Sequence, residues 1–177
     1  MRRLLLPTLV LALALPASAQ AAFTIATTGA SVSKLGPFKP AGDARLQAAI
    51  AAFGTPTSTK PRGDYACVVE WLNFGLKIRF VSFGGLPEGS PACSPEIGLA
   101  QTFSVRSRRF RTWAGLRPGD LQARIPELHP AERHGRWWWL QRGTRRPGTE
   151  RLLPVLKARV TDGRVDRIDG WIGAAGD

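Results

Sequence analysis

Residues 76–83 have the pattern of a strand, and apolar and charged positions alternate from residue 76 to residue 80. Leucine, isoleucine and phenylalanine occupy every second position from residue 76 to residue 80, and Lys77 and Arg79 lie between them. This period of two is typical of a β-strand with one buried side and one solvent-facing side. Residues 65–72, which are rich in aromatic and β-branched residues, predict an antiparallel partner strand connected through residues 73–75.

Further strands are predicted in the second half of the chain. Residues 99–111 and residues 137–141 combine apolar, aromatic and β-branched residues. Residues 152–161 and 164–172 flank Asp162-Gly163, a dipeptide typical of two-residue hairpin turns, and therefore predict a hairpin. Segments dominated by proline, glycine or charged residues are expected to be loops: residues 86–97 and residues 142–151.

Two segments have the pattern of helices. Residues 46–53 place apolar side chains at helical spacing, with Asp43 as a candidate N-cap and Gly54 suited to the C-terminal end. Residues 120–128 predict a second helix, although Pro126 lies inside it and favours a short or interrupted one.

These two helical segments belong to stretches that repeat the same order of residue types. Residues 38–54 and residues 116–128 share the order apolar, basic, proline, Gly-Asp, Leu-Gln-Ala and isoleucine, with three extra residues in the first. Downstream, Leu-Lys-Ile-Arg-Phe at residues 76–80 resembles Leu-Lys-Ala-Arg-Val at residues 156–160. Because internal repeats bear on the whole fold, this order predicts two similar structural units.

The expected fold class is therefore α+β. Each unit would be a short helical segment followed by antiparallel strands, and the two units would form one compact domain. The first unit would span residues 20–100 and the second residues 101–177.

In the second stretch, Gly119 is followed by Ile125 six residues later and by Leu128 three residues after that. With the strands that follow, this pattern resembles the helix–turn–helix and sheet units of SmpA/OmlA-type envelope lipoproteins and of β-lactamase inhibitor proteins. The resemblance covers residues 34–173 and implies tandem units, an internal disulfide and a function in binding other proteins. The family's usual Gly-Met-Thr is replaced here by Gly119-Asp120-Leu121.

Residues 1–19 have the pattern of a secretory signal peptide. Arg2 and Arg3 precede an apolar run, and Ala17-Ser18-Ala19 forms a cleavage motif. The run is shorter than the ~20 residues that span a bilayer. We therefore expect an extracytoplasmic protein, whether secreted, periplasmic or in the cell wall.

The expected export changes which partner the net charge suggests and what the two cysteines are expected to form. The formal net charge is +12, and removal of residues 1–19 would leave 23 basic and 13 acidic residues. Inside a cell such an excess would suggest nucleic acid; outside it, an acidic protein or an anionic envelope polymer is the expected partner. Cys67 and Cys93 are the only cysteines, and an oxidising compartment predicts one structural disulfide between them.

Candidate catalytic residues do not form a coherent set. His129, Glu132 and His134 do not have the spacing of the zinc-protease motifs. Ser104 and Ser107 lie outside any nucleophile-elbow motif. No metal, cofactor or catalytic residue is predicted from these patterns.

Arginine and tryptophan concentrate between residues 104 and 151, which contain 12 arginines and four acidic residues. Both residue types are enriched at binding interfaces. The sequence therefore predicts a secreted, non-catalytic protein that binds a protein or an anionic envelope polymer through a basic, tryptophan-rich face. The candidate binding residues are Arg111, Trp113, Arg136, Trp138 and Arg142.

An exported cell-wall or glycan hydrolase is the alternative prediction. It would use Glu127, Glu132 or His134, because a pair of carboxylates can cleave a glycosidic bond by acid–base chemistry. Two of these groups would have to converge in a cleft.

Overall fold

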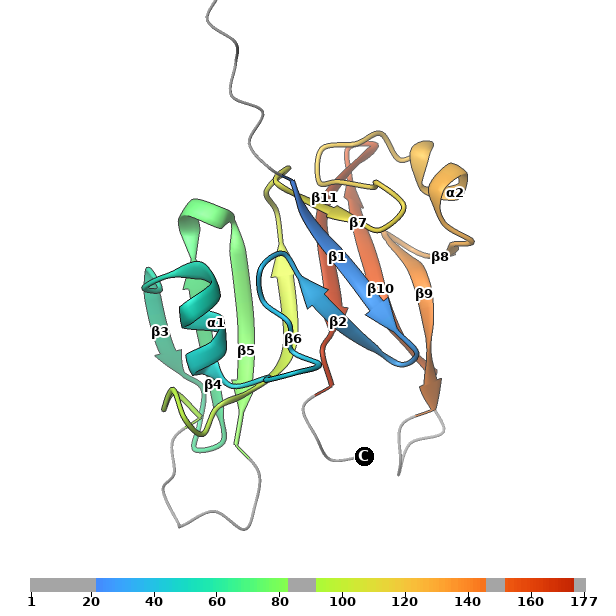
Figure 1. Cartoon of the computed structure of the whole chain (residues 1–177). Helices are drawn as coiled ribbons and strands as arrows, with labels where there is room; N and C mark the ends of the chain where they lie inside the picture. Colours follow the sequence, from blue (N-terminus) through green and yellow to red (C-terminus); the bar gives the residue numbers. More distant parts are fainter. Residues whose placement is uncertain (1–21, 83–91, 146–151, 174–177) are drawn as a thin grey trace, which may run out of the picture.

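The computed structural model describes residues 22–82, 92–145 and 152–173, and these residues are mostly β-structure (Figure 1). Half of them lie in strands and 12% in helices. The prediction of an α+β fold built from tandem helix–strand units is therefore wrong. The helical content is low because the second helical segment forms only over Arg124–Leu128, with Pro126 in its first turn, and because several short segments form strands.

A large antiparallel sheet of eight strands forms the body of the molecule. Two runs of consecutive strands, β3 to β6 and β8 to β11, each follow a meander, and they meet where β6 pairs with β11. In spatial order the strands are β3 (Ser58–Pro61), β4 (Ala66–Trp71), β5 (Leu76–Val81), β6 (Leu99–Val105), β11 (Arg164–Trp171), β10 (Leu152–Thr161), β9 (Trp137–Arg145) and β8 (Glu132–His134).

A three-stranded sheet lies in front of the large one (Figure 1). The hairpin of β1 (Phe23–Thr28) and β2 (Ser31–Leu35) pairs in parallel with β7 (Phe110–Thr112) through β1. The segment predicted as one strand over residues 99–111 is thus two strands, β6 and β7, which belong to different sheets. A turn closed by the Phe110 N–H and the Ser107 carbonyl oxygen separates them.

Helix α1 (Leu46–Phe53) confirms the first helical segment, but the predicted N-cap is wrong: Arg45 precedes the helix, and Asp43 Oδ1 accepts from the backbone N–H of Arg45 instead. Its apolar stripe, including Phe53, packs into the core, and Gly54 ends the helix with a positive φ of 78°. The indole N–H of Trp71 on β4 donates to the Gly54 carbonyl oxygen over 2.8 Å, which fixes the helix against the large sheet.

Helix α2 (Arg124–Leu128) is only five residues long, so the expected helix over residues 120–128 forms only in its second half. A single short 3-10 turn (Leu72–Phe74) connects β4 to β5. Among the described residues, no helix is long and apolar enough to cross a membrane.

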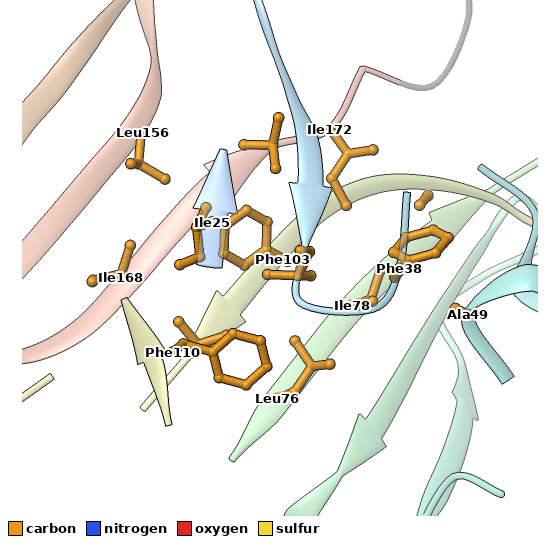
Figure 2. Packing of buried hydrophobic residues seen from close by; sticks show 14 of the residues in the cluster. Ile25, Phe38, Ala49, Leu76, Ile78, Phe103, Phe110, Leu156, Ile168 and Ile172 are labelled. Atoms are coloured by element: carbon orange, nitrogen blue, oxygen red, sulfur yellow. The ribbon is translucent and has the colours of Figure 1, made fainter. Parts of the chain in front are cut away.

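One continuous hydrophobic cluster fills the space between the large sheet and the layer that covers it. Figure 2 shows side chains from β1, β5, β6, β7, β10 and β11 directed into this layer. On β5 the expected alternation is confirmed, since Leu76, Ile78 and Phe80 are buried while Lys77 and Arg79 are exposed.

The two predicted hairpins are also confirmed. Strands β4 and β5 pair antiparallel, as do β10 and β11 around Asp162 and Gly163, both of which have a positive φ. By contrast, β9 continues to Arg145, where a loop was expected from residue 142 onward. The expected unit boundary between residues 100 and 101 lies inside β6, and the division of the chain into two units stays a prediction.

The disulfide between Cys67 and Cys93 is confirmed. Cys67 lies on β4 and is completely buried, and Cys93 belongs to the segment that leads into β6. The bond therefore ties an interior strand of the large sheet to a connection without regular structure. The predicted signal peptide lies outside the described residues.

Candidate binding face

The large sheet has one covered face and one uncovered face among the described residues. In Figure 1, α1 and the small sheet lie on the same side of the large sheet. Side chains that alternate with the core residues therefore point to the other side. There a cleft of about 600 Å³ crosses β4, β5, β6, β11 and β10. We call this uncovered side of the large sheet, with the cleft and the neighbouring side chains of β9 and β10, the open face.

A single cross-strand row runs through the middle of the open face. Lys77 on β5 pairs in register with Ser104 on β6, Ser104 with Asp169 on β11, and Asp169 with Lys157 on β10. The row extends outward to Glu70 beside Lys77. Because directly paired residues of neighbouring strands share a face, these side chains all project from the same side of the sheet.

The row is arranged evenly about the central β6–β11 pair. Lys77 lies one strand outside β6, and Lys157 lies one strand outside β11. These two lysines come from the two Leu-Lys-x-Arg segments that the sequence repeats, so both segments supply a cation at an equivalent distance from the centre.

Basic side chains outnumber acidic ones around the cleft. Its charged lining consists of Glu70, Lys77, Arg79, Arg106, Lys157, Arg167 and Asp169. Both acids are already paired: Lys77 Nζ lies 2.7 Å from Glu70 Oε1, and Arg167 Nε lies 3.0 Å from Asp169 Oδ1. In the described part of the chain, the three remaining cations have no carboxylate partner within ion-pair distance, so the cleft has an excess of positive charge.

The two carboxyl groups differ in environment. The Lys77 ammonium lowers the pKa of Glu70 by hydrogen bonding. Burial raises the pKa of Asp169, and the nearby Arg167 guanidinium opposes that rise. The facing atoms of Asp169 and Arg167 are at ion-pair distance but are not aligned for a hydrogen bond, and both atoms are buried. Asp169 is thus the least hydrated charge in the row.

Tryptophans on the open face hold cations rather than presenting bare rings. Lys157 Nζ lies 4.3 Å from the centre of a Trp137 ring, and the Arg167 guanidinium carbon lies 4.9 Å from it. The His134 ring stacks on Trp139 with 4.1 Å between ring centres. The two contacts with Trp137 are cation–π interactions, and they fix where the charges of Lys157 and Arg167 lie.

A third ion pair links two strands beside the cleft. Arg159 on β10 donates from Nε to both carboxylate oxygens of Asp166 on β11, at 2.9 and 3.0 Å. The guanidinium lowers the pKa of Asp166 through these hydrogen bonds. Both partners are only partly exposed, and the pair joins β10 to β11 at the position where Arg159 also pairs in register with Trp137 of β9.

The five binding residues predicted from the sequence do not gather on the open face. Arg111 and Trp113 belong to β7 and the turn after it, in the covering layer. Arg136 lies in the β8–β9 turn. Trp138 packs against the core, opposite to its neighbours on β9. Arg142 is exposed and pairs with Glu132 at the edge of the large sheet.

Trp113 lies against a buried histidine. The two ring centres are 4.9 Å apart in an edge-on arrangement. His129 Nε2 shares a 2.8 Å hydrogen bond with Thr112 Oγ1, whereas Nδ1 is buried without a partner. Burial lowers the pKa of His129 to about 4. The ring is therefore neutral near pH 7.

Two of the three residues of the hydrolase alternative lie close together, but on exposed surface rather than in the cleft. Glu127 is exposed on α2 and pairs with Arg124. Glu132 and His134 lie two residues apart on β8, with Oε2 and Nε2 3.7 Å from each other, both well exposed to solvent. These two do not line the cleft. In the described residues, no group of three or more acidic, histidine or cysteine side chains could hold a metal ion.

Sequence reasoning missed most of the residues that line the open face: Lys77, Arg79, Arg106, Lys157, Arg167 and Trp171. The repeated Leu-Lys-x-Arg segments could have drawn attention to the two lysines. The position of Arg167 and Trp171 on the same face as these lysines depends on the register of β11, which is not visible in the sequence alone.

Comparisons of this chain with protein-family models, with curated proteins and with solved structures returned no match. The resemblance to envelope lipoproteins and β-lactamase inhibitor proteins therefore stays a prediction.

Proposed function

We propose that this protein is an extracytoplasmic, non-catalytic binding protein that recognises an anionic partner on the open face of its large sheet. The observation that supports this most directly is the excess of unpaired cations around the cleft. Arg79, Arg106 and Lys157 have no carboxylate partner among the described residues, while both acids of the cleft are already paired. An acidic partner would supply the missing countercharge.

The disulfide supports the extracytoplasmic part of the proposal. Bonds of this kind persist in oxidising compartments and are rare in the cytosol. The predicted signal peptide and the Cys67–Cys93 bond both support an extracytoplasmic location.

Binding of defined polyanions tests the proposal. The purified protein is mixed with labelled poly-L-glutamate or a labelled polyuronate, with neutral dextran as the reference, and binding is followed by fluorescence anisotropy. We expect binding of at least one polyanion and none of dextran. Lys77→Gln combined with Lys157→Gln should weaken it about tenfold or more, since two charge contacts are removed.

A matched control removes the same number of charges elsewhere. Lys34 and Lys39 are exposed and belong to the β1–β2 hairpin and the turn after it, away from the cleft. The Lys34→Gln/Lys39→Gln variant should bind like the unmodified protein. Absence of binding to both polyanions, or equal weakening in both double variants, would contradict the proposal.

The predicted residues outside the cleft are tested in the same assay. A variant with Arg111→Gln and Arg136→Gln keeps the open face intact. If this variant loses binding while Lys77→Gln/Lys157→Gln does not, the binding surface is the one predicted from the sequence rather than the open face.

A further inference from the structure

The spacing of cations on the open face narrows the class of partner, if the proposed function holds. Lys77 and Lys157 lie in one cross-strand row, with Ser104 and Asp169 between them. Three inter-strand steps separate them, which at ~4.8 Å each places their backbones about 14 Å apart.

An extended polypeptide matches this spacing. At ~3.4 Å per residue, side chains at positions i and i+4 lie about 14 Å apart and point to the same side. Two carboxylates at those positions could therefore contact Lys77 and Lys157 together. The Lys77 ammonium, which already pairs with Glu70, has three N–H donors and would be shared between Glu70 and the partner. The side chain at i+2 would then face the centre of the row.

The centre of the row selects against a third acid. Asp169 lies there, it is only 17% exposed, and Arg167 already pairs with it. Burial raises its pKa, which shows how poorly this place solvates negative charge. A polymer with a negative charge on every repeat would bring one of them against Asp169, whereas a peptide can place a neutral residue at i+2.

The rest of the lining also fits a protein segment better than a charged polysaccharide. Val68 and Trp171 project from the adjacent row and, with Leu153, give the cleft an apolar wall. Apolar side chains of a peptide could pack there. Trp137 and Trp139, which could otherwise stack on sugar rings, are already in contact with cations of the protein itself or with His134.

We propose that the open face binds an extended acidic segment of a partner protein, with carboxylates four residues apart over Lys77 and Lys157 and a neutral residue between them. The segment would cross the central strands of the large sheet. Salt bridges at its two ends would set its register, and apolar contacts beside Trp171 would contribute affinity.

Three capped peptides of equal length test this proposal. One has glutamates at positions i and i+4 and valine at i+2, the second has the same composition with adjacent glutamates, and the third has glutamate at i, i+2 and i+4. Binding is followed by isothermal titration calorimetry. We expect the first peptide to bind about tenfold tighter than the second, because only it reaches both lysines. The third should bind no tighter than the first.

Lysine variants show whether the preference arises from the proposed contacts. Lys77→Gln and Lys157→Gln, each alone, should abolish the difference between the first two peptides, and Lys39→Gln should preserve it. Lys77→Arg and Lys157→Arg should also preserve it, because they keep the charge. Thermal unfolding followed by circular dichroism checks that each variant is folded.

The outcomes separate this inference from the function on which it rests. Equal binding of the first two peptides, or tighter binding of the third, overturns the peptide spacing. If polyuronate binds more tightly than every peptide, and this binding depends on the two lysines, the anion-binding function stands. The proposal that the partner is a protein segment is then overturned. Binding of no anionic probe overturns both.

Discussion

At the scale of single residues, titratable side chains of this protein differ in how far they are buried and in whether they have a charged partner. His129 is the clearest case, since its ring is only 3% exposed and its single hydrogen bond is to Thr112. Asp166 and Glu70 instead gain cationic partners that keep them ionised. The buried histidine therefore makes the stability of this protein depend on pH between about 4 and 6.5, and the upper part of this window lies above the ordinary pKa values of both carboxyl groups.

We expect the free energy of unfolding to fall as the pH is lowered from 7 to 4. The pKa of His129 is about 4 in the folded protein and near 6.5 when unfolded, so the unfolded chain binds more protons between these values. Stability should therefore rise with pH across this window, by about 3 kcal/mol for this group. Urea unfolding at pH 7 and pH 4 measures it.

The His129→Gln variant should lose most of this dependence, whereas His134→Gln should keep it because His134 is exposed on β8. An equal fall in stability between pH 7 and pH 4 in the unmodified protein and the His129→Gln variant would contradict the assignment.

At the scale of elements, the alternation of side chains along a strand decides which residues can bind a partner. On β9, Trp137 pairs with Arg159 and Trp139 with Lys157, on the open face, while Trp138 pairs with Ala158 and packs on the core. The sequence gives three consecutive tryptophans without showing which side of the strand is buried. Only the pairing with β10 resolves this.

Trp138→Ala and Trp137→Ala should therefore differ in their effects. Removing Trp138 takes partly buried surface from the core and should lower the free energy of unfolding by about 2 kcal/mol. Removing Trp137 should cost less stability but weaken binding of acidic peptides, because it releases Lys157 and Arg167. Urea unfolding and calorimetry distinguish the two; the opposite ranking would show that the faces of β9 are reversed.

The disulfide also acts at this scale, by linking β4 to the connection before β6. Replacing Cys67 and Cys93 together by serine should lower the free energy of unfolding by about 3 kcal/mol, since closure of a loop of this size restricts the unfolded chain. Addition of a reductant should destabilise the unmodified protein and leave the double variant unchanged. A variant as stable as the oxidised protein would show that this bond contributes little.

At the scale of the whole molecule, one hydrophobic cluster joins the large sheet to its covering layer and leaves the opposite face of the sheet for polar side chains. The excess of positive charge there is surface charge, and salt screens such interactions. Binding of poly-L-glutamate should therefore weaken steadily between 50 mM and 500 mM NaCl. Salt-independent binding, measured by anisotropy, would indicate an apolar rather than an electrostatic surface.

The sequence alone determined the local features. Alternation at residues 76–80 predicted β5, Asp162-Gly163 predicted the β10–β11 turn, and the only two cysteines predicted their own bond. These predictions rest on the alternation of side chains along a strand, on the geometry of a two-residue turn and on the number of cysteines. All three can be read from the sequence without knowing which distant segments pair. The short strands β1, β2, β3 and β8 escaped prediction because few residues define them and their partners are distant.

Tertiary structure decided the fold class and the position of the candidate site. Which face of β9 is buried, whether residues 99–111 form one strand or two, and which cations line the cleft all follow from strand pairing between distant segments. Pairing free energy depends on both partners and on the core that they share, so no single segment specifies it. For this reason the binding face predicted from the arginine- and tryptophan-rich stretch differs from the open face. The residues of the open face come together only through the register of β5, β6, β11 and β10.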